Sequence, residues 1–257
     1  MATRGWRNGF SDVVAAIRGT LADAGNAGSI SVANFNRLST LGADWFFTAG
    51  DLIRGVVPTL TTCPLRSDCQ DMTFLEAAVT GTGVAAPLAG ATGGQITVSS
   101  GATAGGIGNL RNAGSATIGL VPNLRTSKYA LASRARLVTL PTGAGGFFLA
   151  RMSDLGASNV GFLVIPSFNP TNYVAICGGA FADTGVPFGT TTSRSFYVVA
   201  DGANVRYYID GTLVATVTQL GAAVAAGRVD CNAYNAATAE VVSFHVDKLA
   251  VFTEAPT

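Results

Sequence analysis

The stretch DGANVRYYIDG, residues 201–211, decides the fold class of this chain. An Asp-Gly pair stands at each end of it, and Asp-Gly favours tight turns because glycine accepts a positive φ and Asp hydrogen-bonds the nearby backbone. Between the pairs, every second residue is large and apolar: Val205, Tyr207 and Ile209. That period is typical of a strand with one buried face. The β-branched run TLVATVT follows at once. We therefore predict a hairpin over residues 204–218, with a two-residue turn at Asp210 and Gly211.

Residues 72–257 carry strand patterns throughout. Short apolar or alternating runs are separated by Gly, Pro, Asn or Asp, as in GGQITVSSG, KYALASRARLVTL, GGFFLARMS, NVGFLVIPS, SFYVVADG and EVVSFHVDKLAVFTE. Many short strands at fairly regular spacing indicate a sandwich or jelly roll. We predict a mainly β domain over residues 72–257.

Residues 1–71 have a different pattern. The segments 10–25 and 31–42 have helical signals, and three adjacent aromatic residues follow at 45–47. A segment this short and broken buries too little apolar surface to form a core alone. We predict a partly helical arm that anchors the protein to a partner surface through its large apolar residues: Phe10, Ile17, Trp45, Phe46 and Phe47.

The composition excludes several classes of function. Charged residues make up 12% of the chain and the net charge is +1, against roughly 25% charged residues in a typical domain. We therefore expect no nucleic acid partner, because such binding needs a basic surface. We expect no membrane insertion, because no run of about 18 apolar residues occurs. The first ten residues lack the apolar core of a signal peptide, so we expect synthesis in the cytoplasm without export by that route.

The basic residues are almost all arginine, with 14 Arg against two Lys. Protein interfaces are enriched in Arg and depleted in Lys, although a GC-rich genome explains the same bias. A low-charge surface is poorly protected against association. We therefore expect a homo-oligomer.

A family resemblance rests on the order of several segments. GGQITVSSGATAGG, KYALASRARLV, GGFFLARMS, RSFYVVADGANVRYYIDGTLVAT and VVSFHVDKLAVF together resemble the concanavalin A-like (laminin-G type) jelly roll, in particular the version found in structural proteins of tailed bacteriophages. The resemblance covers residues 72–257, and the hairpin is its most specific part. It implies two curved antiparallel sheets, a place in the virion and, by analogy with phage appendages, a trimer.

The catalytic inventory is small. Glutamate occurs only at Glu76, Glu240 and Glu254, whereas a glycosidase needs two carboxylates across the scissile bond. The Glu-x-Asp-x-(x)-Glu motif of carbohydrate-cleaving enzymes with this fold is absent. Asp201 and Asp210 are explained by their turns. We therefore predict that the protein is not an enzyme and has no catalytic residues.

The one histidine, His245, is predicted to be a structural or surface residue. Its neighbours Phe244 and Val246 should face the core with Val242 and Ala250, whereas His245 should face the opposite side. Side chains two apart on a strand point in parallel, so Ser243, His245 and Asp247 do not converge as a catalytic triad.

The four cysteines do not form a metal-binding pattern. CPLRSDC places Cys63 and Cys69 close enough for a short-loop disulfide, and two free thiols are the alternative. Cys177 and Cys231 lie in strand-like runs and fit the core. No Walker-type loop or Cys/His cluster occurs, and we expect no cofactor and no metal.

These observations favour a non-enzymatic bacteriophage virion protein, a surface appendage or decoration on the head or tail that contacts other virion proteins through its arm. The alternative is a lectin-like module that binds bacterial surface glycans. Aromatic residues at loop tips would carry that binding: Phe168, Tyr173, Phe181 and Phe188. A polysaccharide-cleaving enzyme is the third and least favoured hypothesis.

Overall fold

A computed structural model describes residues 60–67, 69, 72, 75–89, 95–113, 124, 126–153, 159–219 and 228–254. These residues form fifteen strands in two antiparallel sheets and contain no helix, so none of them lies in a helix that could cross a membrane. The predicted mainly β, two-sheet antiparallel sandwich is confirmed.

The larger sheet has eight strands. Along the sheet they are β13 (Thr212–Thr218), β12 (Asn204–Ile209), β11 (Arg194–Asp201), β6 (Lys128–Thr139), β15 (Ser243–Glu254), β4 (Ile96–Ser99) and β3 (Val84–Pro87), with β1 (Leu60–Ser67) also paired to β15.

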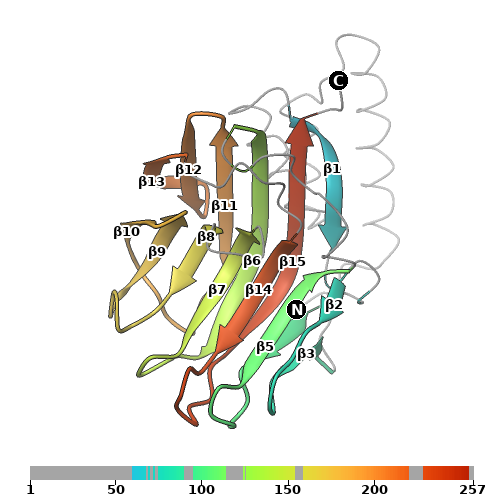
Figure 1. Cartoon of the computed structure of the whole chain (residues 1–257), viewed down its shortest axis with the longest axis vertical. Coiled ribbons are helices and arrows are strands. Elements are labelled where there is room, and N and C mark those ends of the chain that lie inside the picture. The colour runs from blue at the N-terminus through green and yellow to red at the C-terminus, as the bar shows by residue number, and fades with distance from the viewer. Residues whose placement is uncertain are drawn as a thin grey trace, which may run out of the picture. The chain divides into compact units, whose positions relative to one another are not determined.

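The smaller sheet has seven strands. Along the sheet they are β10 (Ala180–Pro187), β9 (Asn172–Cys177), β8 (Asn159–Val164), β7 (Gly146–Ser153), β14 (Arg228–Tyr234), β5 (Ile107–Asn112) and β2 (Leu75–Ala77). In Figure 1 the labelled strands of both sheets follow these orders from left to right.

The predicted hairpin is confirmed as β12 and β13. Ile209 pairs with Thr212 across the two-residue turn. Asp210 and Gly211 have φ values of 50° and 81°, and positive φ at both central residues defines the type I′ turn that suits the twist of a hairpin. The Asp210 carboxylate accepts hydrogen bonds from the Ser195 backbone N–H and from Arg194. The turn is therefore tied to β11 as well.

The core lies between the sheets and is rich in aromatic rings. Tyr207 of the hairpin meets Phe162 of the opposite sheet edge to face, with ring centroids 5.3 Å apart. Its hydroxyl donates to the Ile176 carbonyl, which also belongs to the opposite sheet. Burial of such side chains is worth about 1.5–3 kcal/mol each, so the strand that identifies the fold in the sequence also joins the two sheets.

The sheets begin before residue 72, the start of the β domain that the sequence pattern predicts. β1 pairs with the second half of β15, from Ser67↔Leu249 to Leu60↔Glu254, while β4 pairs with its first half. The chain divides into two compact units between Gly55 and Val56.

Several sequence predictions lie outside the described residues. They are the helices at 10–25 and 31–42 and the anchoring side chains Phe10, Ile17, Trp45, Phe46 and Phe47. The side chain of Cys63 also lies outside them, so the Cys63–Cys69 disulfide stays a prediction.

Candidate functional site

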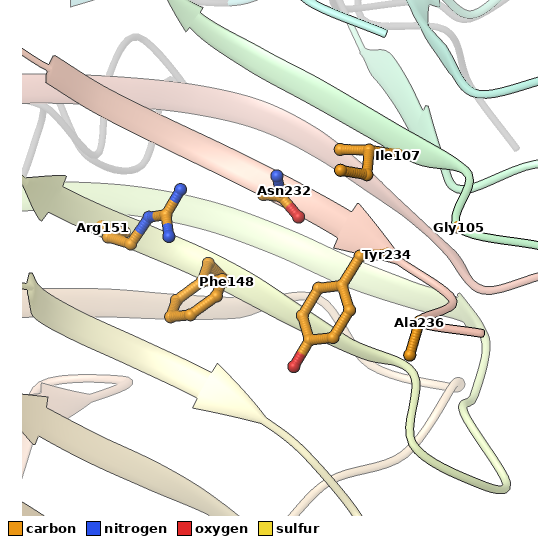
Figure 2. Close-up of a pocket in the computed structure, with 7 residues that line it drawn as sticks. All are labelled: Gly105, Ile107, Phe148, Arg151, Asn232, Tyr234 and Ala236. Carbon is orange, nitrogen blue, oxygen red and sulfur yellow. The ribbon is translucent and has the colours of Figure 1, made fainter. Parts of the chain in front are cut away.

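An open pocket of about 340 Å³ lies on the outer face of the seven-stranded sheet. Neighbouring strands β7, β14 and β5 and two flanking turns supply its lining: Gly105, Ile107, Phe148, Arg151, Asn232, Tyr234 and Ala236. In Figure 2 the Phe148 ring lies between Arg151 and Tyr234. The pocket thus combines two aromatic rings, a guanidinium group and an amide.

A bulge in β7 brings Phe148 and Arg151 to the same face. The pairing of β7 with β8 shifts between Phe148 and Ala150, and Leu149 and Ala150 are both fully buried. In a regular strand, residues 148 and 150 would share a face. The extra residue re-aims Arg151 outward, a common use of bulges.

Arg151 is fixed by a buried carboxylate. Its Nε and Nη2 donate to Oδ1 and Oδ2 of Asp230 at 2.6 Å each, and the Asp230 side chain is 0% exposed. The guanidinium carbon of Arg151 lies 4.1 Å from the centroid of the Phe148 ring. A bidentate ion pair and a cation–π contact therefore hold one side chain in a single position.

Two further arginines make the surroundings of Asp230 positive. Arg228 Nε lies 3.0 Å from Asp230 Oδ2, and Arg111, which pairs with Asp230 across the strands, binds Glu76 at 2.6 Å. Three guanidinium groups against two carboxylates leave one positive charge in excess. Burial lowers the pKa of Arg228, Asp230 raises it, and the neighbouring guanidinium groups lower it further.

Two buried amides beside this cluster each have a side-chain oxygen without a hydrogen-bond partner. Asn232 and Asn109 are 8% and 6% exposed, and neither side-chain oxygen accepts a hydrogen bond. A buried acceptor without a donor costs about 1–3 kcal/mol. Because Asn232 lines the pocket, a hydroxyl or amine of a bound molecule could satisfy it.

Tyr234 is the other polar side chain of the pocket. Burial raises the pKa of its phenol and Arg151 opposes that shift, so the hydroxyl keeps its proton at neutral pH. The ring lies 6.2 Å from that of Phe148. Gly146 leaves room for the hydroxyl, since a Cβ there would lie 2.9 Å from it.

The four aromatic residues predicted to contact glycans divide into two pairs. Phe168 and Phe181 are 57% and 47% exposed, and their ring centroids lie 4.8 Å apart. Tyr173, by contrast, is 1% exposed, and Phe188 is half-buried against it. Placing Tyr173 and Phe188 at exposed loop tips is therefore wrong, because both pack against the core.

The remaining sequence candidates have structural surroundings. Asp201 accepts hydrogen bonds from the backbone of Ala203 and Asn204, as a turn residue does. His245 is half-buried on the eight-stranded sheet beside Arg136, whereas Phe244 and Val246 are fully buried. These positions agree with the sequence predictions.

In the described part of the chain, no three His, Cys, Asp or Glu side chains are grouped to hold a metal ion. Cys177 and Cys231 belong to the core as predicted. Burial raises the pKa of the Cys231 thiol, which keeps the thiol protonated and donating to the Leu149 carbonyl.

Sequence reasoning missed the pocket residues Arg151, Asp230, Asn232 and Tyr234. One local signal was present: in the run RVDCNAY, the buried Val229, Cys231 and Ala233 alternate with polar side chains. That alternation identifies a strand whose outer face is polar. The alternation does not predict that β7 and β5 are the neighbours of this strand in the sheet.

Comparisons with known proteins support the fold. No protein-family model and no curated protein matches the chain. Among solved structures, a protein of unknown function from Shewanella oneidensis MR-1 has a TM-score of 0.51 at 14% identity, over 79% of this chain and 93% of that one. A structure reported with "endo-acting O-glycanases to initiate mucin breakdown" has a TM-score of 0.50 at 13% identity, over 76% and 100%. The fold is thus the predicted concanavalin A-like jelly-roll sandwich.

The similarity to the structure of a sialidase corrects the prediction that the protein is not an enzyme. The sialidase matches with a TM-score of 0.51 at 10% identity over 76% of this chain, which spans 19% of the sialidase. The prediction that the protein is not an enzyme is contradicted, because enzymes that act on glycans are among the structures with this fold. The missing pair of glutamates excluded only one catalytic arrangement.

Proposed function

We propose that the outer face of the seven-stranded sheet binds a carbohydrate, with one sugar unit in the pocket between Phe148, Tyr234 and Asn232. The buried, unpartnered oxygen of Asn232 carries the proposal. A sugar presents hydroxyl donors to such an acceptor, and its C–H faces suit the apolar faces of aromatic rings. Small-molecule sites typically combine an apolar lining with a few fixed polar groups.

The positions of the other groups support the same ligand. Arg151 is held by Asp230 and Phe148, so it loses little conformational freedom when a ligand binds. The protonated Tyr234 hydroxyl can donate to a ring or hydroxyl oxygen. The similarity of the fold to a sialidase and to an O-glycanase structure agrees with a glycan ligand.

A glycan array probed with the full chain tests this function. Array hits are then titrated against Phe148→Ala and Asn232→Ala, with Leu213→Ala, an exposed residue of the other sheet, as the control. Each pocket variant should weaken binding at least about tenfold, equivalent to about 1.4 kcal/mol. Asn232→Ala should not lower the melting temperature, because it removes an unsatisfied polar atom. No binding to the array, or unchanged affinity in both pocket variants, would refute the proposal.

The same protein samples can be assayed for cleavage of the bound glycan. Reducing-sugar release and absorbance from new double bonds would detect hydrolysis and elimination of the bound glycan. Tyr234→Phe removes only the phenolic hydroxyl. If the protein cleaves its ligand through Tyr234, this variant should lose turnover and keep most of its affinity, because the ring stays in place and only one hydrogen bond to the ligand is removed.

We also propose the virion of a tailed bacteriophage as the setting, with the segment before β1 holding the protein on other virion proteins and the β domain meeting a bacterial surface glycan. This part rests on the sequence resemblance. Mixing particles that lack the protein with either the full-length chain or a chain of residues 56–257, which keeps β1, tests the arm: only the full-length chain should join the particle. Light scattering tests the expected homo-oligomer, with a trimer as the expected mass.

A further inference from the structure

A row of outward-facing positions connects the pocket to the edge of the sheet. Phe181 of β10 pairs with Ile176 of β9, Ile176 with Gly161 of β8, and Gly161 with Arg151 of β7. Three strand spacings therefore separate Phe181 from Arg151, or about 14 Å. The row ends in the pocket at one side and at an exposed aromatic pair on the other.

The exposure of the two aromatic rings of Phe168 and Phe181 is unusual for this protein. Phe168 and Phe181 are the aromatic residues among the large hydrophobic side chains that are exposed in the described part of the chain. Single exposed apolar residues are normal on a protein surface, whereas adjoining ones indicate a contact site. The two rings, tilted by 43°, form a continuous apolar surface.

The loop that carries Phe168 is held in place by its own hydrogen bonds. The backbone N–H groups of Phe168 and Asn169 donate to the Ile165 carbonyl. The Asn169 side-chain oxygen accepts from the backbone of Thr171 and Asn172. A platform fixed before binding costs little entropy when a ligand docks.

The two positions between the pair and the pocket are buried, since Ile176 is 5% exposed and Gly161 packs closely against β7. A Cβ at Gly161 would lie 1.9 Å from the Ala150 carbonyl oxygen, so this position is restricted to glycine. A ligand that spans the row therefore finds its contacts at the two ends, in the pocket and on the exposed pair.

We infer that the ligand is a linear oligosaccharide chain that runs across the strands from the pocket to a second contact on Phe168 and Phe181. This inference rests on the proposed function and adds the length and direction of the ligand. The chain passes over the buried positions Gly161 and Ile176, and its contacts lie in the pocket and on the exposed pair. A sugar ring stacks on the exposed pair, while another unit occupies the pocket.

The dependence of affinity on ligand length tests the inference. Cello-, N-acetylated chito- and uronate oligosaccharides, each as dimer, tetramer and hexamer, are titrated against the full chain. The wild type should bind the hexamer of its preferred series at least tenfold more tightly than the dimer. The double variant Phe168→Ala/Phe181→Ala should bind the dimer with the affinity of the wild type. Its affinity should not increase from dimer to hexamer. Val138 and Leu213 are exposed on the other sheet, so the control variant Val138→Ala/Leu213→Ala should keep the increase of affinity with ligand length.

The outcomes separate this inference from the proposed function. If dimer and hexamer bind the wild type equally, or the Phe168/Phe181 variant keeps the gain with length, the second contact is refuted and the pocket stands. If no series binds at any length, the pocket and the second contact both fail. If the variant loses affinity for the dimer as well, the pair belongs to the first sugar site and the chain's path is refuted.

Discussion

Arg151 and Asp230 form a bidentate ion pair across strands β7 and β14, with both N···O distances at 2.6 Å and the carboxylate fully buried. The two residues are 79 positions apart in the chain. The pair fixes the guanidinium group that lines the pocket, so it links the stability of the sheet to the shape of the candidate site.

Asp230→Asn should destabilise the domain strongly. The change leaves the largely covered Arg151 and Arg228, which are 11% and 20% exposed, without their shared buried carboxylate. Breaking a buried pair in this way costs about 3–5 kcal/mol. Glu76→Gln is the control, because its pair with Arg111 is about one-third exposed and such pairs contribute up to about 1 kcal/mol. Urea denaturation measures both. Equal effects in the two variants would show that Asp230 is not the stabilising centre of the cluster.

Gly211→Val tests the turn that decides the fold. Gly211 has a φ of 81° and open space around it, so a valine there is opposed by backbone strain alone. We expect a loss of about 1 kcal/mol or more, measured as a lower melting temperature. Gly179→Val is the matched control, since Gly179 also has open space and its φ lies outside the left-handed region. A melting temperature unchanged from wild type in Gly211→Val would refute the role of the positive φ.

The hairpin was predictable because its signals are local. Asp210 and Gly211 specify the turn, and the alternation through Tyr207 specifies the buried face. The pocket was not predictable in the same way. Arg151 and Asn232 meet because β7 and β14 are neighbours in the sheet, and strand order depends on the packing of the whole domain.

Bulges in the strands also prevented a correct prediction of which side chains face the core. The pairing of β15 with β6 shifts between Val246 and Lys248, so Leu249 and Val251 join the core. We had predicted Ala250 on the core face together with Phe244. Ala250 is fully buried as predicted, but it lies on the other face of the strand, because one extra residue reverses the alternation for the rest of the strand.

His245 should make stability depend on pH. Burial and the Arg136 guanidinium lower the pKa of its imidazole below the ordinary 6.5. The unfolded chain therefore takes up a proton at a higher pH than the folded protein, and the free energy of unfolding should fall as the pH drops through 6.5. His245→Gln should flatten this dependence between about pH 8 and about pH 5.5 in urea denaturation. An equally steep dependence in the variant would assign it to other groups.

The start of the β domain can be tested by truncation. β1 pairs with Val251, Ala250 and Leu249 of β15, and Leu65 on β1 is 5% exposed. A chain of residues 72–257 lacks this strand, so it loses the backbone hydrogen bonds along half of β15 and the buried Leu65 side chain. A chain of residues 56–257 keeps both and begins at the division between the two compact units. Removing a buried leucine costs about 2–5 kcal/mol, which lowers the melting temperature of a domain this size by at least about 4 °C.

We therefore expect the 56–257 chain to melt like the full-length protein and the 72–257 chain to melt clearly lower, with both followed by circular dichroism in the β region. Leu65→Ala in the 56–257 chain separates the contribution of the buried side chain from that of the strand pairing, because it removes the side chain and keeps the pairing with β15. The melting temperature of this variant should lie between those of the two truncated chains. If the 72–257 chain melts at the same temperature as the 56–257 chain, β1 contributes nothing to the sheet and the domain starts at residue 72, as the sequence pattern alone predicts.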